Sequence, residues 1–397
     1  MSEWREVTLG DVLTLQRGFD LPARARVVGP YPIISSSGVT GRHAVAKVEP
    51  PGVVIGRYGS LGSVHWTTEP FWPLNTALWV KDFKGNDPRY LSYLLRTVTV
   101  DGSSASAVPG VNRNHLHRLP VRVPHHAAQL RISAALAAFD ELVEINERRI
   151  ELLEGLARSL YREWFVRSRF PGHDSDGGVT SDDEPIPEGW RAGTVDNFFE
   201  VIGGGTPSKR EPAFWEGGTV DWYTPSDLTR SKDRFTHGSA DRITELGVQK
   251  SAARRFPAGS VLMTSRATLG VLAIATSSAC CNQGFIVVPP TDDVPPTFLY
   301  EWLASQNAQL EAIATGATFK EITKGAFKRV PFIKPSADVL AAFAAAVAPL
   351  ENEIATLERS NRALARTRDL LLPRLVTGRL DISDVDLGAL LPHEAAT

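Results

Sequence analysis

Two arginines in short turns are the side chains of this sequence best suited to recognition chemistry. Arg57 lies in the turn at residues 56–60, between two apolar runs, and Arg266 lies in the turn at residues 264–268, which takes its place in the second copy. A guanidinium carries forked donors that can contact guanine bidentately or hold a phosphate. Arginines in loops are more often only solvated, so that interpretation stays open for both. The same turns offer further donors at Tyr58, Ser60 and Thr268.

Weaker candidates for contacts to a polyanion lie just before repeated strands or within polar loops. Specific reading of DNA needs donors on loops beside a rigid sheet, because phosphate contacts set position and base contacts set specificity. Simple solvation of these side chains is again the alternative. The candidates are Asn112, Arg113, Ser208, Lys209, Ser226, Lys320 and Lys324.

The motifs that would indicate an enzyme do not occur in the sequence. The glycine-rich run 203–206 lacks the Gly-Lys-Ser/Thr ending of a phosphate loop, and there is no GxGxxG, GxSxG or HExxH. His115, His117, His125 and His126 cluster, but no acidic or Cys ligand stands near them at metal spacing. Surface histidines are the favoured interpretation and a hydrolase the remote one. We therefore expect no catalytic residue, no metal and no cofactor bound by this chain.

The elements that must position these side chains occur twice. Trp4-Arg5 followed by Thr8 recurs as Trp190-Arg191 followed by Thr194, and the strand at 119–121 recurs at 330–332. Each copy begins with short apolar runs bounded by Gly, Pro and Asn, which is typical of strands. Two similar surfaces at a fixed separation suit a bipartite target better than a single substrate pocket.

Each copy ends in a long segment in which seam positions, mostly apolar, alternate at spacings of four and three. This spacing, held over more than four heptads, predicts a coiled-coil seam, with helices roughly 50 Å long at ~1.5 Å per residue. Two separate amphipathic helices are the alternative. Asn146 and Asn361 fall on the seam, where a polar residue commonly fixes register. The seam comprises Ile132, Leu136, Phe139, Val143, Asn146, Ile150, Leu153, Ala157, Leu160 and Trp164, then Phe343, Val347, Leu350, Ile354, Leu357, Asn361, Leu364, Arg368, Leu371 and Leu375.

These patterns predict an α+β protein in which two strand-rich globular regions alternate with two long helices. The expected segments are a globular region at 1–124, a long helix at 125–170, an acidic linker at 171–189, a second globular region at 190–335, a second long helix at 336–382 and a tail at 383–397.

Composition places the chain among ordinary globular proteins. It has 397 residues, of which 43% are hydrophobic and 22% charged. We see no apolar run of about 18 residues and expect no membrane span. The adjacent Cys280 and Cys281 suit buried filler in a reducing cytoplasm. Basic residues exceed acidic ones by 14 to 9 in 1–124 and by 16 to 14 in 190–335, which mildly favours a polyanion partner.

The chain resembles the specificity subunit of a Type I restriction–modification system. The resemblance is carried by Gly203-Gly204-Gly205-Thr206-Pro207-Ser208, by Trp222-Tyr223-Thr224-Pro225-Ser226-Asp227 and by the closing run from Leu371 to Ile382. It implies two target-recognition domains and two long helices paired as an antiparallel coiled coil. It also implies a non-catalytic subunit that binds double-stranded DNA and two modification subunits, and in some systems restriction subunits. In the first copy Gly18-Phe19-Asp20 replaces the Gly-Gly-Thr-Pro-Ser run.

The resemblance implies adenine N6 methylation within a split DNA site, one half read by each recognition domain. S-adenosylmethionine would then belong to the modification subunit, and ATP and magnesium to the restriction subunit. The alternative is a two-domain DNA- or protein-binding adaptor that acts without a methyltransferase. Apolar residues off the seam form either a second face for a partner or part of one broad core stripe. They are Leu142, Ile145, Leu152, Leu156 and Phe165.

Overall fold

The chain forms two compact units. The computed structural model describes residues 4–98, 111–172, 186–266, 268–316, 320–382 and 385. Unit 1 comprises residues 1–144 and 362–397, and unit 2 comprises residues 145–361. Each unit therefore combines one globular region with a part of each long helix, whereas the sequence pattern divides the chain into consecutive segments.

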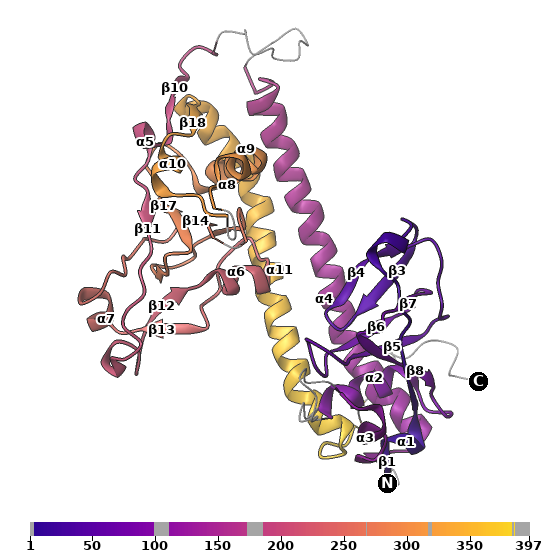
Figure 1. Cartoon of the computed structure of the whole chain (residues 1–397). Helices are drawn as coiled ribbons and strands as arrows, with labels where there is room; N and C mark the ends of the chain where they lie inside the picture. The colour runs from indigo at the N-terminus through magenta and orange to yellow at the C-terminus, as the bar shows by residue number, and fades with distance from the viewer. Residues whose placement is uncertain are drawn as a thin grey trace. The chain divides into compact units, whose positions relative to one another are not determined.

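The described residues of unit 1 form three sheets (Figure 1). The two-stranded sheet closes the copy by bringing its first strand beside its last, and β3 and β7 pair in parallel. The four-stranded sheet has the order β2 (Thr14–Arg17), β8 (Ala77–Asp82), β5 (Gly52–Gly56), β6 (Val64–Thr67). The three-stranded sheet has the order β4 (Gly38–His43), β3 (Tyr31–Ser35), β7 (Trp72–Pro73), and the two-stranded sheet pairs β1 (Arg5–Thr8) with β9 (Pro120–Val123).

Unit 2 repeats this arrangement strand for strand. The parallel pair recurs as β12 with β16, and the closing pair recurs as β10 with β18. Its sheets are β11 (Ile202–Gly203), β17 (Phe285–Val288), β14 (Val261–Thr264), β15 (Leu272–Ile274); then β13 (Asp241–Ile243), β12 (Val220–Tyr223), β16 (Cys280–Cys281); and β10 (Arg191–Thr194), β18 (Pro331–Lys334). The internal repeat predicted from the sequence is thereby confirmed.

Short helices cover these sheets in the same way in both units. α2 packs on β5 and β6, and α8 packs on β14 and β15. Both helices begin with proline, whose fixed φ suits the first helical position. Unit 1 has α1 (Leu9–Val12), η1 (Ala23–Ala25), α2 (Pro88–Thr97) and α3 (Arg113–His117). Unit 2 has α5 (Val195–Phe198), η3 (Pro212–Phe214), α6 (Pro225–Ser231), α7 (Glu245–Gln249), α8 (Pro296–Ser305), α9 (Asn307–Ile313) and α10 (Lys324–Lys328).

The two long helices are α4 (His126–Tyr161) and α11 (Ala337–Val376). They lie within the predicted ranges 125–170 and 336–382. A π-helical turn, η2 (Arg162–Val166), follows α4 and changes the side-chain spacing there. Tyr161, which is the last residue of α4 and lies off the predicted seam, is buried beside Phe343.

Within each unit the two helix parts pack against each other in opposite directions. In unit 2, Asn146 lies opposite Asn361 and Tyr161 lies opposite Phe343, so one helix ascends as the other descends. In unit 1, Asp140 of α4 accepts a hydrogen bond from Arg368 of α11 at 2.6 Å. Arg368, the charged interruption of the second stripe, therefore occupies the seam because α4 supplies its counter-charge.

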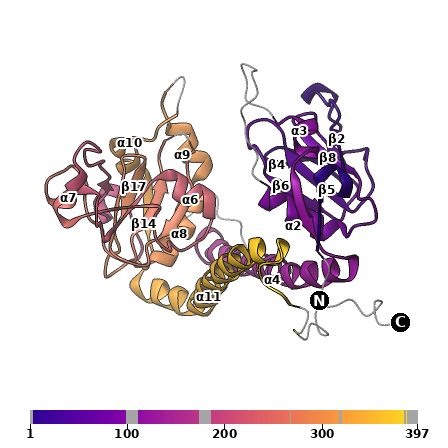
Figure 2. The same ribbon diagram turned by 90° about the horizontal axis from the view of Figure 1, so that it is seen from below.

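The seam is most tightly packed where the globular regions cover it. Leu136 in unit 1 and Phe343, Val347 and Ile354 in unit 2 have no exposed side-chain area. Figure 2 shows α8 beside α11 on this covered side, and Phe298 of α8 joins Phe343 in one core cluster. The alternative of two helices that do not pair with each other is wrong.

One window of α11 is apolar enough to match a membrane span by length and composition, with a mean hydropathy of 1.3 and 28% of the window buried. The sequence pattern predicts no such run. Within α11, Leu340, Phe343 and Val347 are at most 1% exposed in the core of unit 2. Alanines supply many of the other residues of this helix.

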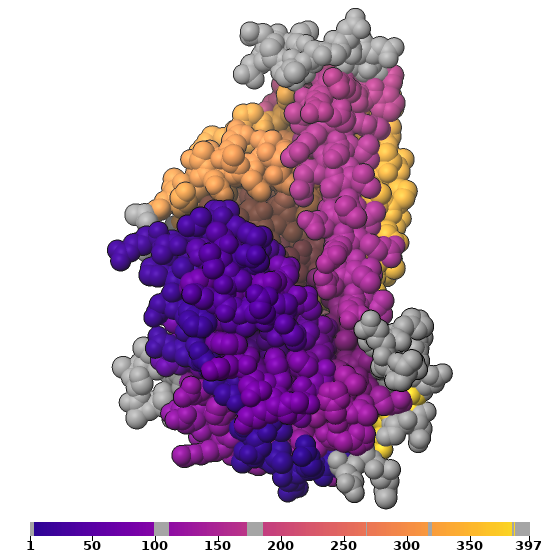
Figure 3. All heavy atoms as spheres, turned by 90° about the vertical axis from the view of Figure 1, so that its right-hand side faces the viewer, coloured from indigo at the N-terminus to yellow at the C-terminus, as the bar shows by residue number. Residues whose placement is uncertain are grey.

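The off-seam apolar residues of α4 divide into two groups. Leu142, Ile145, Leu152 and Leu156 are between 48% and 69% exposed. Phe165 instead packs edge-to-face on Phe298 with ring centroids 4.7 Å apart. Figure 3 shows the part of α4 that belongs to unit 2 at the surface. The interpretation that these residues belong to one broad core stripe is therefore wrong for Leu142, Ile145, Leu152 and Leu156. It is right for Phe165.

Candidate nucleic-acid interface

In unit 1 the turn after β5 brings four of the predicted residues together. The backbone N–H groups of Arg57 and Tyr58 both donate to the carbonyl of Thr76, and the carbonyl of Arg57 accepts from Val111 N–H at 3.0 Å. Asn112 and Arg113 follow Val111 directly and are exposed. The guanidinium of Arg57 lies 4.4 Å from the ring centroid of Tyr58. The segments at 57–58 and 112–113 thus form one polar patch.

One of the predicted residues in this patch has a structural role as well. The side chain of Asn112 caps α3 by accepting from Asn114 N–H at 2.9 Å. The turn from Gly56 to Ser60 is tight, since a Cβ on Gly56 would come within 2.0 Å of the Ser60 carbonyl. Ser60 itself is exposed. Arg57 and Arg113 are therefore the residues of this patch best placed for a ligand.

In unit 2 the same backbone contacts recur at the equivalent residues. The carbonyl of Ser265 accepts from Ile322 N–H at 3.0 Å, as that of Arg57 accepts from Val111. Gly270 N–H donates to Thr264, as Gly62 N–H donates to Gly56. The next helix begins with Lys324 where the first copy has Arg113. Each unit thus places a cation at the first position of a short helix beside the arginine turn.

Arg266 is held differently from Arg57. Its guanidinium forms an ion pair with Glu321 at 2.8 Å, and the two residues form an antiparallel bridge. Lys320, next to Glu321, is exposed, and so is Thr268 in the arginine turn. Arg266, Lys320 and Thr268 are therefore exposed or half-exposed around one acidic side chain, which lowers the net positive charge at this place.

The glycine-rich run of unit 2 passes close to the backbone of its neighbours. A Cβ on Gly204 would meet the Asn282 carbonyl at 1.9 Å, and a Cβ on Gly203 would meet Lys324 Nζ at 2.8 Å. Only glycine allows the approach at Gly204, where the facing atom is a backbone carbonyl. The run therefore seats the Lys324 side chain beside β11 and brings the following loop to the turn at 282–284.

The turn at 282–284 lies near only some of the remaining predicted residues, which are Ser208, Lys209 and Ser226. Thr206 Oγ1 donates to Gln283 Oε1 at 2.6 Å. Ser226 lies at the start of α6, and its neighbour Pro225 packs on Gly284. The segment at 208–209 leads away from this turn, because the Ser208 carbonyl binds the indole N–H of Trp215 and Lys209 pairs with Asp241 at 3.8 Å.

Gln283 is a candidate that was missed. Gln283 is exposed in the turn after β16, and its side-chain oxygen accepts a hydrogen bond from Thr206 in the loop after β11. Residues 282–285 align with residues 75–78 in the internal repeat, and both segments begin with a turn, so the repeat could have indicated this position.

The histidines and cysteines have structural environments. His117 Nε2 accepts a hydrogen bond from Leu15 N–H at 2.9 Å, and burial lowers the pKa of its imidazole. Burial raises the pKa of the Cys280 thiol to about 11 and also raises the pKa of Cys281. Among the described residues, no group of three His, Cys, Asp or Glu side chains could hold a metal ion.

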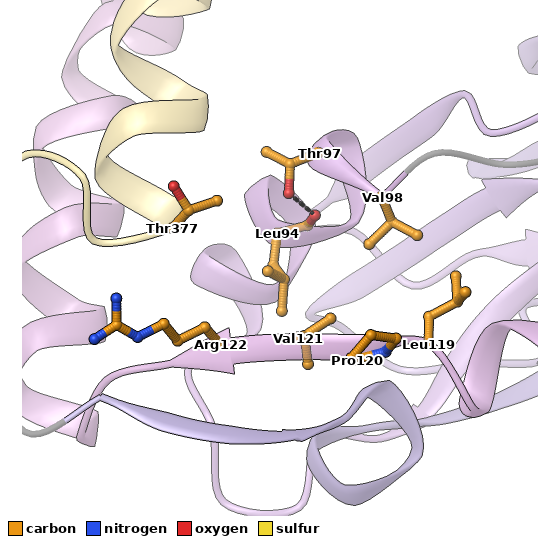
Figure 4. A pocket seen from close by; sticks show the side chains of 8 residues that line it. All are labelled: Leu94, Thr97, Val98, Leu119, Pro120, Val121, Arg122 and Thr377. Atoms are coloured by element: carbon orange, nitrogen blue, oxygen red, sulfur yellow. Dashed lines mark hydrogen bonds between the residues drawn. The ribbon is translucent and has the colours of Figure 1, made fainter.

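A shallow apolar groove of about 290 Å³ lies in unit 1 between α2, β9 and the end of α11 (Figure 4). Its walls include Leu94 and Val121, and Arg122 lies at one end. In unit 2 the equivalent residues are Trp302 and Phe332, whose rings pack with centroids 4.9 Å apart. Smaller side chains in the first copy thus account for the groove.

Comparison with known proteins identifies the repeated units. The family model of the Type I restriction modification DNA specificity domain matches residues 1–155 and 187–364. The MjaIX specificity subunit of Methanocaldococcus jannaschii is 32% identical over 183 residues, which cover 46% of this chain and 42% of that protein. The chain therefore matches less than half of that relative's length.

Two further relatives cover more of the chain. The HindI specificity subunit of Haemophilus influenzae is 22% identical over 337 residues, covering 70% of this chain and 72% of that protein. The crystal structure of the Type I restriction-modification system S subunit from M. genitalium has a TM-score of 0.56 at 15% identity, over 94% of this chain and 96% of that one. That structure shares the α+β fold. Because the family model matches both copies and most of the chain, the protein belongs to the Type I restriction modification DNA specificity domain family.

Proposed function

We propose that this chain is the DNA-reading specificity subunit of a Type I restriction–modification complex. The observation that carries the proposal is the recurrence of one recognition site in both units of a family member. In each unit an arginine turn lies beside a short helix that begins with a cation. Each unit then reads one half of a bipartite DNA site. The chain itself supplies recognition and no catalytic group.

The proposed partners are two modification subunits, and the surface of α4 supports such contacts. Ile145, Leu152 and Leu156 are at least 54% exposed on one helix of unit 2, and apolar area of this kind favours protein contact. The modification subunits would supply S-adenosylmethionine and flip the target adenine out of the stack. Restriction subunits would add ATP-dependent cleavage. We place the complex in the cytoplasm, where its DNA is.

The test is modified-base sequencing of genomic DNA from source cells with and without this gene. We expect loss of adenine methylation at one split, asymmetric motif. Replacing residues 4–124 with those of another family member should change one half of that motif and leave the other half unchanged. A change in both halves would contradict the assignment of one half-site to each unit.

The adaptor alternative predicts a different result. An adaptor folds and remains soluble alone, does not co-purify with a modification subunit, and leaves the methylation pattern unchanged. The relatives named above carry the name of specificity subunits, which favours the first function.

A further inference from the structure

A buried arginine joins the globular part of unit 2 to its long helices. Arg234 lies in the segment before β13 and is 1% exposed. Its Nη1 donates to Glu301 of α8 at 2.8 Å, and its Nη2 donates to Glu351 of α11 at 2.9 Å. The guanidinium also lies 4.0 Å from the ring centroid of Tyr300. One side chain thus bridges two helices from a third segment.

A second carboxylate of α11 holds the backbone of the same segment. Glu358, one heptad after Glu351, is 2% exposed. Its two oxygens accept from Arg234 N–H at 2.6 Å and from Phe235 N–H at 3.3 Å, and His237 Nε2 lies 2.8 Å from Oε2. Two positions of α11 that are one heptad apart therefore fix residues 234–237. We call Arg234, Glu301, Glu351 and Glu358 the clamp of unit 2.

The clamp is anchored to the sheet on its other side. The Arg234 carbonyl accepts from Ile274 N–H at 2.8 Å, and Thr236 N–H donates to the Ile274 carbonyl. β15, which ends at Ile274, is the edge strand of the four-stranded sheet. The sheet that carries the recognition turn is thus tied through this segment to α11.

The acidic side of the clamp requires the arginine. Burial raises the pKa of the Glu351 carboxyl and that of Glu154, which α4 brings to the same region. Removing a partner from a buried ion pair leaves an uncompensated charge, which costs far more than the intact pair contributes.

Unit 1 links the corresponding helix positions of the repeat through one aspartate in place of a buried arginine. Asp140 of α4 accepts from the Tyr93 hydroxyl of α2 at 2.6 Å and from Arg368 at 2.6 Å. Arg89 and Arg96 of α2 lie 3.7 and 3.9 Å from the same carboxylate. Asp140 therefore joins α2 to both long helices, as Glu351 joins α8 to α11 through the arginine.

The correspondence follows from the repeat register. The strand at 119–121 recurs at 330–332, and the same shift carries Asp140 to Glu351. α2 begins at Pro88 and α8 at Pro296, and this shift carries Tyr93 to Glu301. Tyr93 binds Asp140 directly, whereas Glu301 and Glu351 are both acidic and need Arg234 between them. Both copies therefore link the same two helix positions, which are 93 and 140 in unit 1 and 301 and 351 in unit 2.

We propose that Arg234 is a positioning residue that holds the second recognition domain at one angle on its helices, and that this angle restricts the DNA spacer length at which the domain finds its half-site. The inference rests on the proposed function. A recognition domain that is held at both Glu351 and Glu358 cannot tilt on α11. It therefore reads its bases at one place along the DNA. With the clamp removed, the base-reading turn is unchanged but the domain tilts on its helices.

The first test measures the tilt without DNA. Spin labels at Lys250→Cys and Thr356→Cys, both exposed positions of unit 2, report the distance between the globular part and α11. The native cysteines are buried. The distance distribution should broaden in Arg234→Met and stay unchanged in the matched control Arg242→Met, an arginine 57% exposed and paired with Asp221. An unchanged width in Arg234→Met would overturn the clamp.

The second test measures its consequence in the assembled complex with modification subunits. The substrates are DNAs with the native spacer and with spacers one base pair shorter or longer. The preference for the native spacer should fall by roughly tenfold in Arg234→Met, a typical size for coupling between sites, while the half-site bases stay the same. An unchanged preference in a folded complex would leave Arg234 merely structural.

Misfolding of Arg234→Met and failure of the proposed function can each be told apart from failure of the clamp. Where Arg234→Met fails to fold, the triple variant with Glu301→Gln and Glu351→Gln removes the guanidinium together with its two carboxylate partners and keeps both measurements available. Where the wild-type complex methylates no DNA at any spacer, the proposed function fails, and the spin-label distances still decide whether the clamp holds the domain.

Discussion

The two copies hold their recognition arginines in different ways. Arg57 stacks on Tyr58, and a cation–π contact of this kind covers the face of the guanidinium while its N–H donors point outward along the edge. Arg266 directs its donors to Glu321. Under the proposed function, a base edge would compete with solvent for Arg57 and with the Glu321 carboxylate for Arg266, so the first unit would offer the stronger arginine contact.

We expect Arg57→Ala to weaken binding of the complex to its cognate DNA by about 1–3 kcal/mol and to relax discrimination at one base of the first half-site. Fluorescence anisotropy with cognate and single-substitution DNAs measures both effects. Arg42→Ala is the matched control, because Arg42 is half-exposed in the same unit and pairs with Glu69. Equal losses on every DNA would indicate a phosphate contact in place of base reading.

Sequence alone could find these residues but not their partners. The turns at 57 and 266 are visible because they repeat. The pairing of Arg266 with Glu321 joins residues 55 positions apart and depends on the backbone bridge between them. Asn112 was predicted as a ligand contact, but its side chain caps a five-residue helix whose start the sequence pattern did not indicate. Arg234, inside a polar stretch, gave no signal of its burial.

One polar layer of the long helices restricts how the two helices can align. Asn146 Nδ2 donates to Asn361 Oδ1 at 2.8 Å in unit 2, and Asn146 is 9% exposed. The repeat register places the two asparagines one layer apart, but opposite directions of the helices bring them into the same layer. Paired amides at a seam disfavour every shifted alignment, because a shift buries each amide against apolar side chains.

We expect Asn146→Leu to lower the free energy of unfolding by about 1–3 kcal/mol, because Asn361 then lacks its partner. The double variant with Asn361→Leu should recover that loss and melt at or above the wild-type temperature. Thermal melts of the four proteins of this double-mutant cycle measure the coupling between the two amides. Additive effects of the two substitutions would show that the hydrogen bond does not contribute to stability.

The helices were the most predictable elements and the short ones the least. Ten seam positions in each stripe carry the 3.5-residue pattern, and the observed bounds of α4 and α11 fall within the predicted ranges. The π-helical turn after Tyr161 was not predictable from apolar spacing, because aromatic packing on Phe298 and Phe343 selects it. α3 and α10 have five residues each, too few for a periodic pattern.

For the whole chain, the sequence repeat predicted two similar domains but not which residues close each unit. Both described ends of the chain belong to unit 1. Trp4 and Ile382 pack on the same core cluster, and the Trp4 ring lies against Gly378. In unit 2, the helix end and the first strand are held across the linker, since Phe170 stacks on Trp190 with ring centroids 5.6 Å apart. Unit membership is therefore set by packing and not by chain order.

This organisation predicts that the chain tolerates circular permutation. A variant that joins residue 397 to residue 1 and opens between Gly172 and Ile186 keeps the packing of Trp4 on Gly378 and of Phe170 on Trp190. It should melt at the wild-type temperature and direct methylation of the same motif, measured by modified-base sequencing. A second permutant opened between Lys232 and Asp233, beside the buried Arg234, should lose both properties. Equal loss in the two permutants would mean that chain order through residues 172–186, and not packing within each unit, holds the recognition domains in place.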